Sequence, residues 1–266
     1  MNWAQLKHRL GMDGHHAAQQ IADGQLGPIW RLGDFVIKTR QRGPEYALPS
    51  EARGLDALRA VGTPTPRVFI AEPDVLVIDY VPPGPPRWAA CGQHLANQHL
   101  KHQAEYGWAS PTMLASVPFT NELSAVWPAF WIDQRVRPLH ALVRSRIGSM
   151  NVRLNQLLTT FTPPVEGSCL LHGDLWSGNV VMGDSGPFLI DPSVFWGERL
   201  VDVAMMKLFG GFPPQFWRAY EETYPIPADY QAAIPYYQLY YVLVHIHLYG
   251  ATYCQHLHHI LGAYGL

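Results

Sequence analysis

The sequence has no excess of basic charge and few cysteines, and each shortage excludes a class of function. Nineteen Lys and Arg residues face 21 Asp and Glu residues, so the formal net charge at pH 7 is −2. Neutralising a phosphate backbone requires a basic excess, so we expect no nucleic-acid partner. The three cysteines, Cys91, Cys169 and Cys254, are odd in number and show no CxxC spacing. Free thiols in a reducing compartment are therefore expected, which predicts a cytoplasmic protein.

Long apolar runs are missing as well. Residues 1–16 mix Lys, His, Arg and Asp with short apolar groups, so they lack the apolar core of a signal peptide. The most apolar late stretch, residues 236–253, is interrupted by glutamine, histidine and glycine. That pattern favours a buried helix over a membrane span, and no membrane association is expected.

What the chain does contain is enough apolar material for a folded core. Hydrophobic residues make up 48% and charged residues 15% of the 266 residues. Residues 1–16 could form a short amphipathic helix, because Trp3, Leu6 and Leu10 follow helical spacing. Short apolar runs separated by glycine-rich turns then predict a β-meander, with one strand at residues 35–38.

A proline-rich segment divides the chain. Residues 82–86 read Pro-Pro-Gly-Pro-Pro, which can continue neither a helix nor a strand ladder and so marks a linker. Helical patterns dominate after it. We therefore predict a two-lobed α+β fold of the protein-kinase type. Residues 1–80 would form a small antiparallel-sheet lobe that binds nucleotide, and residues 81–266 a larger, mainly helical lobe with the catalytic loop and the acceptor pocket.

The stretch Leu-Leu-His-Gly-Asp-Leu-Trp-Ser-Gly-Asn-Val at residues 170–180 carries the chemistry. Asp174 and Asn179 enclose four residues, which is the spacing of the kinase catalytic loop, and Asp191 follows twelve positions later at the end of an apolar strand. In this arrangement Asp174 is the catalytic base that accepts a hydroxyl proton. Asn179 and Asp191 would bind Mg²⁺, which prefers a few hard oxygen ligands beside phosphate oxygens.

An upstream pair supports this interpretation. Lys38 ends a strand of the VxxK kind, and Glu51 lies at the start of the next predicted helix, which matches the kinase pair that holds the ATP phosphates. Each of these residues alone is more often a solvated or turn residue, so the prediction depends on their combination. Gly24 and Gly27 stand where a phosphate-covering turn would be, but neither GxGxxG nor GxxxxGK[ST] is present. His172 is expected to hold the catalytic loop by hydrogen bonds.

These residues resemble the fructosamine kinase (ketosamine-3-kinase) family, a relative of the aminoglycoside phosphotransferases. The resemblance is carried by Leu-His-Gly-Asp-Leu-Trp-Ser-Gly-Asn at 171–179, Asp-Pro-Ser-Val at 191–194 and Leu-Phe-Gly-Gly-Phe-Pro at 208–213. It implies an ATP- and Mg²⁺-dependent kinase of the 3-hydroxyl of a ketosamine, such as a fructosamine or ribulosamine, in deglycation repair. It also implies that Asp79, Tyr80 and Val81 form the hinge that meets adenine, and that Asp202 holds the catalytic loop from a neighbouring helix.

The acceptor is the part that the sequence defines least. The segment after Gly211 is rich in aromatic residues and poor in acids, which favours a sugar with at most one amine over a polycationic aminoglycoside. Trp196 follows Asp191 by five positions and is predicted to be the acceptor platform. The alternatives are an aminoglycoside, amino-alcohol or sugar phosphotransferase, and a nucleotide-binding pseudokinase that serves as an interaction module. Whether the ketosamine is free or protein-bound stays open, as does the oligomeric state.

Overall fold

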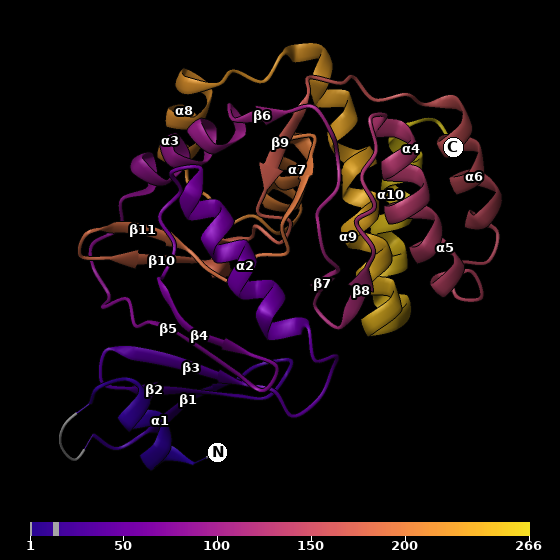
Figure 1. The fold of residues 1–266 in the computed structure, drawn as a ribbon. Helices are drawn as coiled ribbons and strands as arrows, with labels where there is room; N and C mark the ends of the chain where they lie inside the picture. Colours follow the sequence, from indigo (N-terminus) through magenta and orange to yellow (C-terminus); the bar gives the residue numbers. More distant parts are fainter. Residues whose placement is uncertain (1, 13–15) are drawn as a thin grey trace.

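An antiparallel sheet forms the first part of the computed structural model, which describes residues 2–12 and 16–266 (Figure 1). Its strand order is β1-β2-β3-β5-β4. The strands are β1 (Gln19–Asp23), β2 (Pro28–Leu32), β3 (Phe35–Thr39), β4 (Val68–Glu72) and β5 (Val75–Asp79). Lys38 of β3 pairs with Ile29 of β2 and Leu76 of β5, so it lies on the central strand of the sheet.

Helix α2 (Ala47–Ala60) packs on the face of this sheet that is turned toward the later residues (Figure 1). Leu48, Ala52 and Leu55 recur at helical spacing and are buried against Leu76 and Ile78 of β5. This packing fixes the rotation of the helix. The first turns of α2, which carry Glu51, are thereby held over β3.

The N-terminal helix is shorter than predicted. Helix α1 spans Trp3–Arg9 and ends there because Leu10 leaves the helical conformation and Gly11 adopts a left-handed φ of 63°. The predicted apolar face is confirmed, since Trp3, Leu6 and Leu10 all pack with the sheet core. Met1 and residues 13–15 of the predicted helix lie outside the described residues.

Residues 80–87 connect β5 with the helix that begins at Trp88, and they lie against the hairpin of residues 180–189. The Gly84 N–H donates to the Met182 carbonyl at 2.7 Å. A Cβ atom on Gly84 would lie 2.3 Å from the Gly183 carbonyl carbon, so only glycine fits this approach. We propose to place the boundary between the two lobes at residue 80, where the sheet ends.

The remaining chain is mainly helical. Its helices are α3 (Trp88–His99), α4 (Trp127–Trp131), α5 (Arg137–Val143), α6 (Met150–Thr160), α7 (Leu200–Phe209), α8 (Pro214–Thr223), α9 (Ile234–Tyr249) and α10 (Cys254–Ala263). Short helical turns add η1 (Ile132–Val136), η2 (Ser177–Asn179), η3 (Ala228–Ala233) and η4 (Gly250–Tyr253). The short strands are β6 (His102–Gln103), β7 (Thr112–Leu114), β8 (Val117–Phe119), β9 (Ser168–Leu171), β10 (Val180–Gly183), β11 (Gly186–Leu189) and β12 (Phe195–Gly197).

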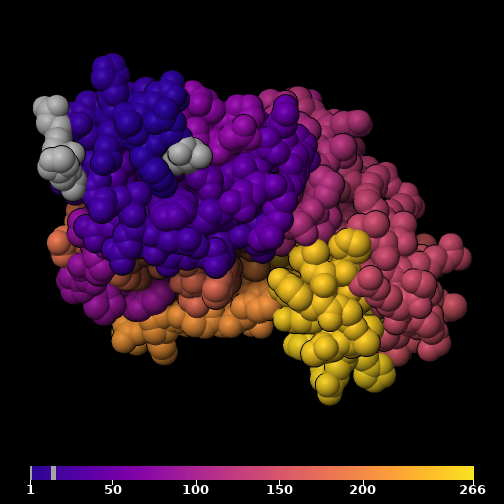
Figure 2. All heavy atoms as spheres, turned by 90° about the horizontal axis from the view of Figure 1, so that it is seen from below, coloured from indigo at the N-terminus to yellow at the C-terminus, as the bar shows by residue number. Residues whose placement is uncertain are grey.

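Helix α9 runs through the core of this lobe, and most aromatic residues of the C-terminal segment are buried in that core. Tyr237 and Tyr240 pack with Trp127 and Trp131 of α4. The C-terminal residues lie beside α6, and Figure 2 shows them in yellow next to the pink residues. Among residues 2–12 and 16–266, no helix is long and apolar enough to cross a bilayer.

Candidate active site

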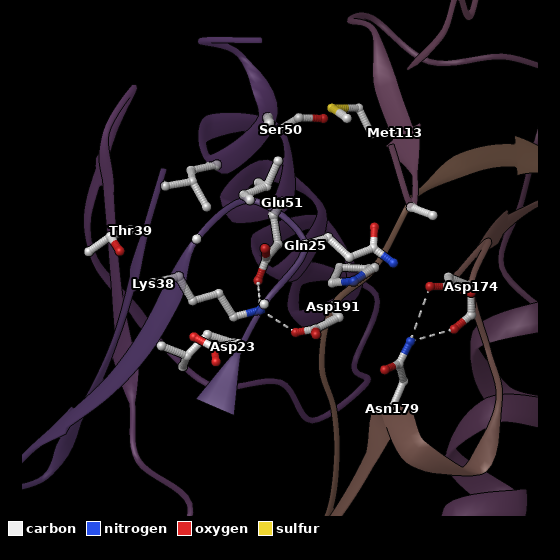
Figure 3. Close-up of a pocket in the computed structure, with 18 of the residues that line it drawn as sticks. Asp23, Gln25, Lys38, Thr39, Ser50, Glu51, Met113, Asp174, Asn179 and Asp191 are labelled. Carbon is white, nitrogen blue, oxygen red and sulfur yellow. Dashed lines mark hydrogen bonds and ion pairs between the residues drawn. The ribbon is translucent and has the colours of Figure 1, made fainter. Parts of the chain in front are cut away.

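A cavity of about 380 Å³ lies between the sheet and the helical lobe (Figure 3). Residues 23–27, which are the end of β1 and the turn to β2, line part of it. Lys38 and Glu51 reach into it from the sheet lobe, and Asp174, Asn179 and Asp191 reach into it from the helical lobe. The five residues that the sequence pattern predicted to act together therefore line one cleft.

Lys38 is the cation of this cleft. Its Nζ donates to Glu51 Oε1 at 2.6 Å and also contacts Asp191 Oδ1. Only 12% of the Lys38 side chain and 14% of the Glu51 side chain are exposed. Burial alone would lower the pKa of Lys38, but the carboxylates of Asp191 and Glu51 outweigh it and hold that pKa above its ordinary value. Lys38 thus stays charged and can meet an anionic phosphate.

Asp174 and Asn179 face each other across the catalytic loop between β9 and β10. The Asn179 side-chain N–H group donates to the Asp174 carbonyl at 2.7 Å and, more weakly, to Asp174 Oδ2 at 3.4 Å. Figure 3 shows the Asn179 amide oxygen directed away from Asp174. The strands that flank this part of the site, β10 and β11, form an antiparallel hairpin in which Val180 faces Leu189.

A buried carboxylate holds the catalytic loop through hydrogen bonds to its backbone. Asp202 of α7 accepts hydrogen bonds from the His172 and Gly173 backbone N–H groups at 2.7 and 2.8 Å, which confirms the contact expected from the family resemblance. His99 of α3 lies 3.3 Å from the same carboxylate, and its other ring nitrogen lies 2.9 Å from the Tyr220 hydroxyl. The sequence pattern gave no partner for His99, because its partners lie more than a hundred residues away.

His172 holds the catalytic loop by hydrogen bonds, as predicted. Its Nε2 lies 2.9 Å from the Ile190 carbonyl, and its Nδ1 lies 3.3 Å from the Asp174 backbone N–H. Burial lowers the pKa of His172, so the ring is neutral. In this state Nε2–H donates to Ile190 and Nδ1 accepts from Asp174. One imidazole thereby ties the base to the residue that precedes Asp191.

Two unusual backbone conformations aim the carboxylates. Gly173 has a φ of 80°, and a Cβ atom there would lie 2.0 Å from the Ser193 carbonyl oxygen. Asp191 itself adopts a φ of 57°, a left-handed conformation that is uncommon for a residue with a side chain. Such conformations persist only where the surroundings impose them, and they cluster at functional sites.

The motif at 208–213 supports the catalytic loop directly. Gly211 has a φ of 86°, and a Cβ atom on it would lie 2.0 Å from Ser177 Oγ and 2.6 Å from Ser177 Cβ. Gly210 also has a positive φ, of 71°, but a Cβ atom on it would have no neighbour within 4 Å among the described residues. The role of this motif was not predicted from the sequence. Its glycine at position 211 allows the end of α7 to lie directly against the catalytic loop.

This contact gives a prediction with a matched control. Gly211→Ala should displace Ser177 and the loop, and should lower kcat by about 10²-fold, because catalysis is sensitive to shifts of about 1 Å. Gly210→Ala also strains the backbone, because a φ of 71° with a ψ of −155° favours glycine, but it causes no collision, so its kcat should fall much less. In the Ser177→Gly background, which removes both colliding atoms, Gly211→Ala should behave like Gly210→Ala. Equal kcat losses in Gly210→Ala and Gly211→Ala would refute the contact as the cause.

The pKa of Asp174 is raised to about 7, first by burial and then by the negative charge of Asp191. A base must be ionised, so activity should fall as the pH drops through this value. We expect kcat/KM to decrease about tenfold for each pH unit below the pKa. The measurement is a pH profile of steady-state kinetics. A profile that stays flat down to about pH 5 would show that Asp174 ionises normally or is not the base.

A second cavity of about 250 Å³ adjoins the first and also reaches Asp174. It shares Gln25, Ala115, Asp174 and Trp176 with the first cavity. Trp176 is 44% exposed and stands two positions after the predicted base. We call this second space the acceptor cavity, after the role that we propose for it. The sequence pattern did not identify Trp176 as a residue of the site, although Trp176 lies within the 171–179 motif.

Trp196 occupies a different place. It lies in β12, pairs with Leu170 of β9, and packs against the cluster of Leu58, Leu170 and Val194. Trp196 is not among the residues that line either cavity. Its predicted role as acceptor platform stays untested, and the geometry favours Trp176 for it.

The three predicted hinge residues lie at the end of β5 and beyond. Asp79 accepts hydrogen bonds from the Arg67 side chain at 3.0 and 3.3 Å, and the Arg31 guanidinium covers the Tyr80 ring at 3.7 Å. Val81 lies against Gly183 of the β10–β11 hairpin. These residues do not line the 380 Å³ cavity, so adenine contact by the hinge stays a prediction.

The donor set of the cleft fits a magnesium ion held mainly by phosphate. Among the described residues, no group of three or more His, Cys, Asp or Glu side chains could hold a metal by itself. Asp191 offers a carboxylate that is 41% exposed, and Asn179 offers an amide oxygen. Mg²⁺ keeps several waters and commonly binds through one or two carboxylates plus substrate phosphates, so these two residues suit it.

Comparison with known proteins is consistent across sequence and structure. Residues 4–264 match the family model described as "Fructosamine kinase". A protein of Thermus thermophilus named a probable ketoamine kinase is 40% identical over 248 residues, which cover 93% of this chain and 94% of the relative.

Solved structures give the same picture. One assigned to a fructosamine-3-kinase of Thermobifida fusca superposes with a TM-score of 0.87 at 28% identity, and the match covers 98% of this chain and 96% of the other. The ternary complex of streptomycin, ATP and APH(2″)-IIa superposes with a TM-score of 0.64 at 12% identity, covering 98% and 95%. The predicted two-lobed α+β fold of the kinase type is thus confirmed.

Proposed function

The chain belongs to the fructosamine kinase family and is an ATP-dependent phosphotransferase, and we propose that it phosphorylates the 3-hydroxyl of a ketosamine in deglycation repair. The observation that carries the proposal is the meeting of two cavities at Asp174, one with Lys38 and one with Trp176. A sugar hydroxyl in the acceptor cavity can then donate its proton to Asp174 while it attacks a nucleotide phosphate held in the adjoining cavity. In-line phosphoryl transfer requires the attacking hydroxyl oxygen and the leaving β-phosphate oxygen to lie on opposite sides of the γ-phosphorus, with the base within reach of the hydroxyl proton.

Each residue of the cleft has a role in this reaction. Lys38, oriented by Glu51, holds the ATP phosphates. Asp174 accepts the proton of the attacking hydroxyl, and its raised pKa suits a base that works near neutral pH. Asn179 and Asp191 hold the magnesium ion, which neutralises charge on the transferred phosphoryl group when it is bound. Asp202 and His172 position the loop and do not contact the reactants.

The acceptor cavity favours a sugar with little positive charge. Asp174 is the one carboxylate among the described residues that line it, and Trp176, Phe209 and Tyr249 supply aromatic surface. A polycationic aminoglycoside would need several carboxylates to replace the water around its ammonium groups. A ketosamine carries one amine and can lay its apolar face on Trp176.

A panel of acceptors tests this function. ATP consumption would be followed with a fructosamine, a ribulosamine, an aminoglycoside, an amino alcohol and a free sugar. We expect the ketosamines to give the highest kcat/KM. A preference for an aminoglycoside or amino alcohol would reassign the acceptor, and binding of ATP without turnover of any acceptor would favour a pseudokinase.

A further inference from the structure

We propose that a third cavity, beside the acceptor cavity, binds the substituent on the ketosamine nitrogen, and that the preferred substituent is uncharged and aromatic. This inference rests on the proposed function. The cavity has a volume of about 280 Å³ and lies between α7, α9, η4 and the start of α10. We call it the substituent cavity. Its lining consists of Leu208, Phe209, Val242, His245, Thr252, Tyr253 and His256.

The substituent cavity adjoins the acceptor cavity, because Phe209 and His245 line both. A ligand that fills the acceptor cavity therefore meets these two rings before it reaches the substituent cavity. Each volume is below the range of roughly 300–1,000 Å³ that is usual for a complete small-molecule site. A two-part ligand, with a sugar in one cavity and a substituent in the next, matches this division.

His245 stands at the junction with a defined protonation state. Its Nδ1 lies 2.7 Å from the Tyr241 carbonyl, so Nδ1–H is the donor of that bond. Burial lowers the pKa of His245, so the ring is neutral and Nε2 carries a lone pair. That nitrogen can accept a hydrogen bond from the charged amine of a ketosamine. The amine is the group that links the sugar to its substituent, and the junction is where it would lie.

The walls of the substituent cavity determine what kind of substituent fits. The His245 ring centroid lies 4.8 Å from that of Phe209 and 4.8 Å from that of Tyr253, and Tyr253 lies 5.5 Å from His256. These are contact distances for aromatic rings, so a further ring can join the cluster. Among the described residues that line this cavity there is no Asp, Glu, Lys or Arg. A charged substituent would lose its hydration there without compensation.

The test compares two ketosamines that differ only in the substituent, the fructosamine of benzylamine and the fructosamine of methylamine. For the wild-type protein, kcat/KM should be at least about tenfold higher with the benzylamine derivative. The reason is that its apolar ring is transferred from water into the substituent cavity. Thr252→Trp, at an exposed position on the cavity wall, should fill the space and bring the ratio of the two kcat/KM values close to one. Thr252→Ser is the matched control and should keep the ratio.

The outcomes separate this inference from the function on which it rests. Equal kcat/KM for the two ketosamines in the wild-type protein, or a ratio that Thr252→Trp leaves unchanged, would overturn the substituent cavity while the ketosamine function stands. If neither ketosamine is phosphorylated, the proposed function is wrong and the inference falls with it. His256→Trp, also at an exposed wall position, provides a second blocking variant should Thr252→Trp unfold.

Discussion

Asp174→Asn is expected to lower kcat by about 10²- to 10⁴-fold, the usual contribution of a general base. Asparagine fills the same space but cannot accept the hydroxyl proton. The contacts that hold the loop, from Asp202 and His172 to the backbone at residues 172–174, do not involve the Asp174 carboxylate and should persist. The dissociation constant of ATP should therefore change by no more than about threefold.

Steady-state kinetics and nucleotide titration together measure this effect. Asp184→Asn is the matched control, because Asp184 is an exposed carboxylate in the turn of the β10–β11 hairpin and lines neither cavity at Asp174. It should keep full activity. A turnover of Asp174→Asn near that of the wild-type protein would remove Asp174 from the role of base.

Asp191→Asn should abolish most of the effect of Mg²⁺ on ATP affinity and lower kcat by about 10³-fold, since a catalytic metal contributes several kcal/mol. The substitution removes one negative charge beside the phosphates. Asparagine is chosen over alanine because it tolerates the left-handed backbone at residue 191, where φ is 57°. The Lys38–Glu51 pair remains to orient the lysine.

Calorimetric titration with ATP, in the presence and absence of Mg²⁺, measures the coupling directly. The wild-type protein should bind ATP more tightly with Mg²⁺, and Asp191→Asn should show little difference between the two conditions. An unchanged magnesium effect in the variant would contradict the assignment of Asp191 as a ligand.

The sequence predicted the parts of the site that depend on local spacing. Asp174, Asn179 and Asp191 lie on one loop and one hairpin, so their separation along the chain nearly determines their geometry. The Lys38–Glu51 contact was also predictable, because a strand and the helix that follows it pack together through an apolar face. These relations are short-range and follow regular periodicity.

The parts that were missed depend on long-range packing. His99 meets Asp202 from a separate helix, and Gly211 meets Ser177 across 34 residues. For the two tryptophans, distance along the chain was a poor guide. The pairing of β12 with β9 places Trp196 outside the two cavities at Asp174, whereas Trp176 lies in the catalytic loop and lines a cavity with Asp174. Such placements follow from tertiary contacts that no local pattern encodes.

The proposed ketosamine kinase activity is tested most directly by identifying the reaction product. Phosphorus NMR of a reaction with ATP, Mg²⁺ and a fructosamine should show loss of the ATP γ-phosphate signal and a new phosphate ester whose phosphorus couples to the proton on C3 of the sugar. Phosphate attached to another hydroxyl would contradict the proposed site of transfer. Release of inorganic phosphate alone, with the fructosamine unchanged, would contradict the proposal that this chain is a ketosamine kinase.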